Sequence, residues 1–167
     1  MKKNGMTLPE LLVALALIAV LVALTPAFTS MLDRLRLEST TRDLATAIRY
    51  ARTTAVVEQT GVTIKALEGD WGNGWVIFQD RYRSISRDNA EAILIKRKLG
   101  NRVQIKGNGS MARYIHFSAQ GFPKQKSGAF QAGSLVVCSP RIETQSSRLI
   151  LASGGRLRMS AMKTGCT

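Results

Sequence analysis

Histidine and cysteine are almost absent from this sequence. Its 167 residues include one histidine, His116, and two cysteines, Cys138 and Cys166. This inventory is too small for a Cys/His zinc site and for a Ser/His/Asp or Cys/His nucleophile. No phosphate-binding loop and no catalytic pair of carboxylates stands out either. We therefore expect a protein that has no metal, no cofactor and no enzyme activity, and in which His116 is structural.

Acidic residues are almost missing from the second half of the chain. Residues 92–167 contain thirteen Lys/Arg and a single acid, Glu143, whereas residues 1–91 contain eleven Lys/Arg and ten Asp/Glu. Nearly all of the formal net charge of +13 therefore lies in the C-terminal part. A field of one sign attracts polyanions. Anionic lipid head groups and nucleic acid both fit this description, and charge alone does not choose between them.

Polar residues are missing from Leu11 to Leu24, near the N-terminus. The apolar segment as a whole spans residues 7–28 and, as a helix of about 33 Å, is long enough to cross a bilayer. Lys2 and Lys3 precede it, which predicts that the N-terminus stays in the cytoplasm. The ordinary alternatives are a cleaved secretory signal peptide and a signal anchor. Glu10 weakens both, because a carboxylate at the membrane edge is unfavourable without a partner.

The segment from Gly5 to Val13, GMTLPELLV, resembles the type IV prepilin motif. The resemblance implies that a prepilin peptidase cleaves after Gly5 and that the new N-terminal residue, Met6, is N-methylated. It also implies that Glu10 helps to dock the subunit against other pilin subunits through the N-terminal helix. Before assembly the protein would span the inner membrane once, with its C-terminal domain in the periplasm, and after assembly it would belong to a pilus.

The chain beyond the apolar segment has the period of an amphipathic helix. We expect one long helix that ends at about Val57 and has a kink near Pro26. Its core-facing stripe consists of apolar residues mostly three or four positions apart, or multiples of these: Leu32, Leu35, Leu44, Ile48, Ala51 and Ala55. The expected organisation is a leader over 1–5, a membrane-spanning half of the helix over 6–28, an amphipathic half over 29–60 and a β-rich domain over 61–167.

From residue 61 onward, short alternating runs separated by glycine-rich turns predict strands. We expect eight of them: Val62–Leu67, Trp75–Phe78, Ala92–Leu99, Arg102–Lys106, Tyr114–Ala119, Ser134–Cys138, Arg148–Ala152 and Leu157–Met159. No helix is expected after residue 61, so the fold class is α+β, with a long N-terminal α-helix packed on a C-terminal antiparallel β-sandwich-like domain. Two cysteines in an exported domain usually pair, so Cys138 and Cys166 are expected to form a disulfide.

Three blocks of the C-terminal domain resemble the GspH/FimT family of minor pilins and pseudopilins. Gly69–Asp80 resembles its W-x-x-G-W-x-v-F-x-D signature, and Phe117–Gly121 and Ser153–Arg158 resemble later blocks. The resemblance implies a long N-terminal helix packed on two antiparallel sheets. GspH members prime type II secretion pseudopili, whereas FimT-like members serve type IV pili. We expect Trp71 and Trp75 to be core residues at a tight turn rather than a ligand platform.

The tetrapeptide from Gly155 to Arg158, GRLR, is similar to a G-R-x-R motif that is implicated in DNA capture during natural transformation in FimT-like minor pilins. In a strand, Arg156 and Arg158 point to one side, and guanidinium groups suit phosphate oxygens. The alternative is a pair of solvated charges that protect an edge strand. Tyr114 or Phe130 could stack on bases, but nothing in the sequence places either beside the arginines. The expected DNA-binding residues are Gly155, Arg156, Arg158, Arg148 and Lys163.

Two functions remain open at this point. The first is a minor pilin that binds DNA without sequence preference, and the charge skew favours it. The second is a structural minor pilin or a type II secretion pseudopilin that initiates a filament without binding DNA. A second basic cluster, Lys96-Arg97-Lys98, is expected to protect its strand from aggregation rather than to form a site.

Overall fold

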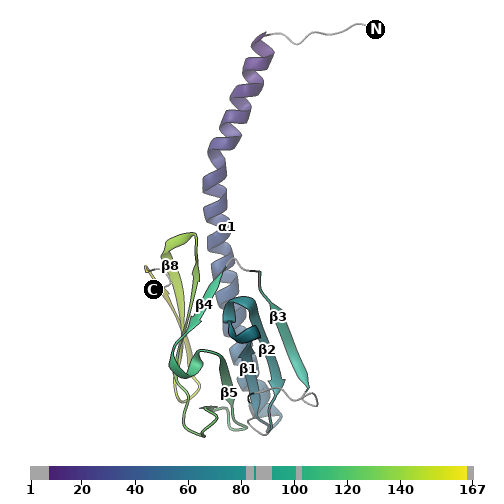
Figure 1. Cartoon of the computed structure of the whole chain (residues 1–167), viewed down its shortest axis with the longest axis vertical. Helices are drawn as coiled ribbons and strands as arrows, with labels where there is room; N and C mark the ends of the chain where they lie inside the picture. The colour runs from purple at the N-terminus through teal and green to yellow at the C-terminus, as the bar shows by residue number, and fades with distance from the viewer. Residues whose placement is uncertain (1–7, 82–84, 86–91, 101–102, 165–167) are drawn as a thin grey trace, which may run out of the picture.

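The structure is a computed structural model that describes residues 8–81, 85, 92–100 and 103–164; the side chains of residues 24–27 and 142–144 also fall outside the description. One helix, α1 (Leu8–Val57), runs for 50 residues without a break and ends at the predicted residue. Pro26, the expected position of a kink, lies inside this continuous helix. Figure 1 shows the N-terminal half of α1 projecting from the molecule and the C-terminal half lying against the strands.

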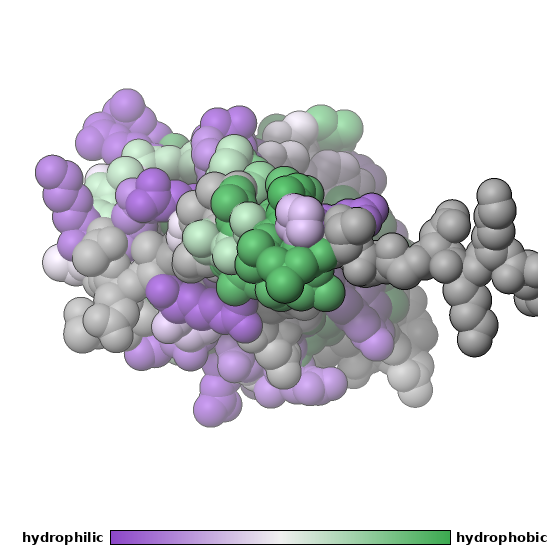
Figure 2. All heavy atoms as spheres, turned by 90° about the horizontal axis from the view of Figure 1, so that it is seen from above, coloured by the Kyte–Doolittle hydropathy of each residue, from purple (hydrophilic) through white to green (hydrophobic). Residues whose placement is uncertain are grey.

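The projecting half of α1 is strongly apolar on its surface. By length and composition, α1 is the one helix within the described ranges that could cross a membrane. Seen from above in Figure 2, the largest cluster of hydrophobic side chains lies near the centre of the view, and many hydrophilic side chains lie around it. A lipid environment would cover this surface without the cost of exposing it to water.

The C-terminal half of α1 supplies one wall of the core. The predicted stripe is buried from Leu44 to Ala55, whereas Leu32 and Leu35 are 46% and 52% exposed, so the prediction was wrong for these two residues. The reason is helical geometry: nine residues separate Leu35 from Leu44, which is two and a half turns at about 3.6 residues per turn, and places them on opposite faces. Leu37, seven residues before Leu44, lies on the core face instead and is 7% exposed.

Two antiparallel sheets complete the core. The first has the order β3-β2-β1-β5-β6 and the second the order β4-β7-β8-β9. Their bounds are β1 (Val62–Ala66), β2 (Gly74–Gln79), β3 (Ile93–Lys98), β4 (Gln104–Gly107), β5 (Tyr114–Phe117), β6 (Pro123–Lys124), β7 (Gly133–Ser139), β8 (Ile142–Leu151) and β9 (Leu157–Met162). Helix α1 contacts strands of both sheets, so the expected α+β architecture is confirmed. The expectation of no helix after residue 61 was wrong in one respect, because three 3-10 helices of three residues each occur there: η1 (Leu67–Gly69), η2 (Trp71–Asn73) and η3 (Gly109–Met111).

Three strands differ clearly from the expectation. β9 ends at Met162, three residues after the predicted end at Met159. The two-residue strand β6 (Pro123–Lys124) was not expected, and β8 begins at Ile142, six residues before the predicted start at Arg148. Both segments lack the apolar alternation from which strands are predicted. They become strands because neighbours pair with them: β5 pairs with β6, and both β7 and β9 pair with β8.

The predicted core residues of the first sheet are buried. Trp71 and Trp75 are 1% and 2% exposed, and the Trp71 indole donates a hydrogen bond of 3.0 Å to a main-chain carbonyl. His116 is also buried, and its Nδ1 lies 2.8 Å from the Thr63 hydroxyl, which in turn donates to an Asp80 carboxylate oxygen at 2.8 Å. A buried polar group needs such partners, so this network is part of the fold.

Candidate nucleic-acid interface

The β8–β9 hairpin carries Arg148 and Arg158 on one face. Leu149 and Leu151 of β8 are at most 1% exposed and belong to the core, so the residues that alternate with them face away from it. Arg148 is one of these residues, and so is Ile150, the partner of Arg158 in β9. Arg148 and Arg158 are therefore diagonal neighbours across the two strands, at a typical separation of about 7–8 Å.

A third cation lies on the same face, on β4. Lys106 pairs with Val136 of β7, and Val136 pairs with Arg148 of β8, so the three residues form one row across the sheet. Two strand spacings of about 4.8 Å separate the backbones of Lys106 and Arg148. Arg148 is half-buried, and its Nε is a buried donor without a hydrogen-bond partner in the described part of the chain. We call the group formed by Lys106, Arg148 and Arg158 the basic face; Arg156 lies beside it, in the turn before β9.

The turn before β9 requires a glycine at one of its two glycine positions. Gly155 has a φ of +79°, and a Cβ placed there would lie 2.7 Å from the Gly121 carbonyl oxygen. Hydrogen bonds close the turn, from the Gly155 amide to the Ala152 carbonyl at 2.8 Å and from the Ala152 amide to the Arg156 carbonyl at 3.0 Å. Only glycine fits this position, because it tolerates the positive φ and has no Cβ to clash. Gly155 therefore fixes the backbone from which the exposed Arg156 projects.

Arg52 of α1 fastens this turn to the rest of the domain. Its guanidinium donates three hydrogen bonds to main-chain carbonyls: to Gly121 at 3.1 Å, to Gly155 at 3.0 Å and to Gly154 at 3.2 Å. A guanidinium has five donors in a rigid plane, which suits such a multiple contact. The arginine thereby ties the β8–β9 turn to the loop after β5.

Sequence reasoning missed two arginines of α1, Arg49 and Arg52. Both line a pocket together with Arg156, although 103 residues separate Arg52 from Gly155. In the sequence they belong to the polar residues of an amphipathic helix, and no spacing rule connects them to a turn so far along the chain. Arg49 is exposed and adds a further positive charge beside the motif.

Lys163, the remaining residue of the predicted site, lies apart from the arginines. It follows β9, five residues after Arg158, which corresponds to about 17 Å along a strand. There it lines a groove between α1 and the β8–β9 edge together with Arg34 and Arg42. The structure therefore places Gly155, Arg156, Arg158 and Arg148 in one region and Lys163 in another.

The second basic cluster lies on the other sheet. Lys96, Arg97 and Lys98 are exposed residues of β3, the edge strand of the first sheet. Arg97 forms an ion pair of 2.7 Å with Asp43 of α1. Charged side chains on an edge strand oppose pairing with a second chain, which agrees with the role expected from the sequence. The cluster provides a matched control for the basic face.

Some of the expected processing residues and cysteines fall outside the described residues. Gly5 and Met6 fall outside it, and Glu10 lies in the first turn of α1, where its side chain is exposed. Cys138 is buried in β7, and its expected partner Cys166 falls outside the described residues, so their disulfide stays a prediction. Within the described residues, no three His, Cys, Asp or Glu side chains group as metal ligands would.

Two family models and several solved structures match the chain. Residues 40–155 match the model of the type II transport protein GspH, and residues 1–25 match the prokaryotic N-terminal methylation motif. The crystal structure of the type IV minor pilin FimU of Pseudomonas aeruginosa matches with a TM-score of 0.64 and 23% identity, over 78% of this chain and 96% of that chain. The minor pseudopilin EpsH of the Vibrio cholerae type 2 secretion system matches with a TM-score of 0.53 and 10% identity, over 75% and 96%. No curated protein matches the sequence.

Proposed function

Because the chain belongs to the GspH family and begins with the N-terminal methylation motif, we propose that it is a minor pilin which binds DNA through the basic face during natural transformation. The family supports the coarser role of a type IV minor pilin or pseudopilin. DNA as a ligand, a FimT-like place within the family and a part in DNA uptake are our proposals.

The concentration of positive charge on one face of the second sheet carries the proposal. Arg148 and Arg158 are diagonal neighbours, and Lys106 lies in the same row as Arg148. The strands β4, β7 and β9 contain no acidic residue, and β8 contains one, Glu143. Phosphate oxygens fit such a face, because guanidinium groups donate two parallel hydrogen bonds to them and ammonium groups add charge.

The same geometry supports binding without sequence preference. Arginines on a flat sheet face reach phosphates, whereas base readout in duplex DNA requires an element that enters a groove. Phosphate contacts release counterions, so binding should weaken with salt at a log–log slope of about −0.9 for each neutralised duplex phosphate. An uptake system that accepts any DNA needs no more than this.

The alternative is a purely structural minor pilin or type II secretion pseudopilin that initiates a filament without binding DNA. The shared fold with FimU and EpsH is compatible with it. The charge skew separates the two functions, since filament initiation by itself gives no reason for thirteen Lys/Arg against one acid after residue 91.

We also propose where the protein is located and how it is processed and assembled. The methylation motif supports prepilin peptidase as a partner, cleavage after Gly5 and methylation of Met6. The apolar half of α1 supports an inner-membrane anchor before assembly and contacts with other pilin subunits afterwards, with Glu10 at the contact. Lys2 and Lys3 support a periplasmic C-terminal domain.

The test compares two double variants of equal net charge. Full-length protein in a neutral detergent is titrated with labelled DNA at several salt concentrations, and fluorescence anisotropy reports binding. We expect Arg156→Gln/Arg158→Gln to lose most of the affinity and to reduce the salt slope by up to about two units. The control is Lys96→Gln/Lys98→Gln on β3. Lys106 is unsuitable as a control residue because it shares a face with Arg148.

The control should lose much less affinity than the motif variant. Equal losses in the two variants would mean that diffuse charge, not the motif, attracts DNA. If the unmodified protein binds no DNA at low salt, the DNA proposal fails and the structural function remains.

A further inference from the structure

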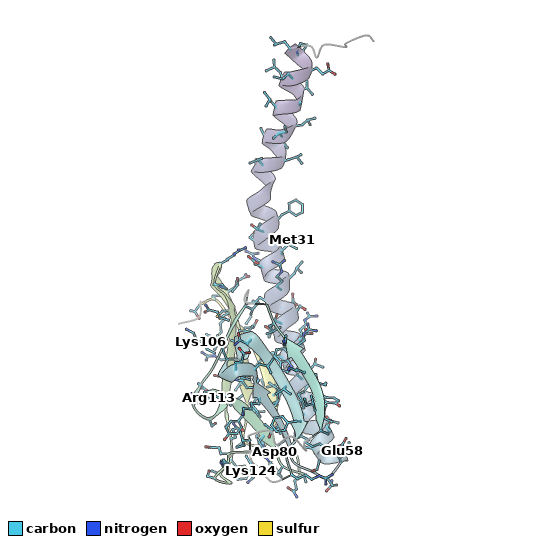
Figure 3. The ribbon with its side chains drawn as sticks, turned by 45° about the vertical axis from the view of Figure 1, so that its right-hand side comes forward. Met31, Glu58, Asp80, Lys106, Arg113 and Lys124 are labelled. Atoms are coloured by element: carbon cyan, nitrogen blue, oxygen red, sulfur yellow. The ribbon has the colours of Figure 1, made fainter. Side chains whose placement is uncertain are left out.

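Two exposed phenylalanines lie next to the arginine motif at the end of the domain. Phe122 and Phe130 are 42% and 56% exposed, which is unusual for such large apolar side chains. Their ring centroids are 6.2 Å apart, with the planes at 81°. The Lys124 ammonium lies 3.6 Å from the centroid of the Phe130 ring. Figure 3 places Lys124 at the end of the domain farthest from the projecting half of α1.

The β8–β9 turn brings this aromatic pair into the neighbourhood of Arg156. Phe122 follows Gly121 directly, and Arg156 follows Gly155 directly. Gly121 and Gly155 are in contact, because a Cβ on Gly155 would lie 2.7 Å from the Gly121 carbonyl oxygen. Arg52 donates hydrogen bonds to both carbonyls. Phe122 and Arg156 therefore each follow a glycine of the same contact, the one between Gly121 and Gly155.

The backbone around the two rings is held in place by hydrogen bonds. The Ser118 amide bonds to the Phe122 carbonyl at 3.0 Å, and the Gln125 side-chain amide bonds to the Phe130 carbonyl at 3.2 Å. The Gln131 amide bonds to the Pro123 carbonyl at 2.9 Å. A surface ordered before binding loses little conformational freedom when a ligand arrives.

From this arrangement we propose that Phe122, Phe130 and Lys124 form a stacking platform for the unpaired bases of single-stranded DNA. The proposal rests on the DNA binding proposed above and names the strand state that the site prefers. Binding of single strands combines a positively charged surface with aromatic rings on which bases stack, and stacking tolerates any base sequence. In a duplex the bases already stack on each other and are not available to the rings.

The charge around the platform agrees with this ligand. Residues 118–131 contain two lysines, Lys124 and Lys126, and no acid. Lys124 covers one face of the Phe130 ring, so a base would stack on the ring surface that the ammonium leaves open, and the ammonium can meet a phosphate of the same strand. Arg156, which follows Gly155, is exposed and can offer its guanidinium to neighbouring phosphates. The strand would thus run from the basic face across the turn to the platform.

The test measures the affinity of the protein and its variants for three probes. These are a short single-stranded oligonucleotide, the corresponding duplex, and an abasic strand with the same phosphates but without bases. The full-length protein in neutral detergent is compared with Phe122→Leu/Phe130→Leu, which keeps apolar volume and removes the rings. We expect the variant to bind the single strand about tenfold more weakly or worse, as the loss of one stacked base implies. Its affinity for the duplex and for the abasic strand should change less than about twofold, and Arg156→Gln/Arg158→Gln should weaken all three.

A second variant keeps the idea testable if the double substitution fails to fold. Phe122→Trp retains an aromatic ring, should preserve single-strand affinity, and should show quenched indole emission when the single strand binds but not when the abasic strand does.

Three results would overturn the platform. One is an unchanged affinity of Phe122→Leu/Phe130→Leu for the single strand, and another is an equal loss on all three probes. The third is that another pilin subunit covers the rings. In that case the variant Phe122→Cys would cross-link to a second chain, and the cross-linked protein would bind the single strand as well as the protein without the cross-link does. If the unmodified protein binds none of the probes, the failure lies with the proposed DNA binding itself.

Discussion

Arg52 should matter for both the stability of the domain and the position of the motif. Replacing it by methionine keeps an unbranched side chain and removes the three hydrogen bonds to the carbonyls of Gly121, Gly154 and Gly155. A hydrogen bond from a charged donor contributes about 1.5–3 kcal/mol to stability. The contact with Gly154 is exposed, so water can replace it, whereas Gly155 is buried and its carbonyl would lose its partner. We therefore expect a loss of about 2–3 kcal/mol rather than the sum of three separate bonds.

For a domain of this size, such a loss lowers Tm by about 8–12 °C. The emission of the buried Trp71 and Trp75 follows unfolding of the detergent-solubilised protein. The matched control is Arg49→Met, less than one turn earlier on the same helix, which removes the same charge from an exposed side chain. It should change stability by less than about 0.5 kcal/mol. Equal effects of the two substitutions, or an Arg52→Met effect within that range, would refute the reasoning.

Two further predictions concern the ends of the chain. The mature protein should begin at N-methylated Met6, which the intact mass of protein purified from its own membranes reports; a start near Phe28 or a retained Met1 would contradict the prepilin assignment. Cys138 and Cys166 should be joined in the native protein by a disulfide whose loop stabilises the domain by about 3.5 kcal/mol in the chain-entropy model. Alkylation under non-reducing conditions followed by mass spectrometry checks this, and two free thiols would disprove it.

Much of the fold could be predicted because its signals are local. The end of α1 at Val57, the burial of Trp71 and Trp75 and the two-sheet architecture all follow from periodicity, turn residues and the family resemblance. Arg156, in the turn before β9, and Arg158, within β9, are both exposed, as expected from the sequence. The prediction failed where a pattern spans a gap without apolar residues, as between Leu35 and Leu44, because a small phase error there moves a side chain to the opposite face.

Strands without an apolar signal could not be predicted for a related reason. β6 and the first half of β8 carry no alternation of their own and form because β5, β7 and β9 offer them hydrogen-bonding edges. Pairing of this kind depends on partners elsewhere in the chain and on the register between them, and the residues of the segment alone determine neither.

The sequence by itself determined that this protein has an apolar N-terminal helix, a prepilin-like start, a β-rich domain and an excess of positive charge after residue 91. Only the tertiary structure decided which of those charges act together. It placed Lys106 in one row with Arg148, placed Lys163 in a separate groove, and brought Arg52 and Gly121 into contact with the turn before Arg156. The physical reason is that composition and periodicity are properties of neighbouring residues, whereas a binding surface depends on strand register and on contacts between segments a hundred residues apart.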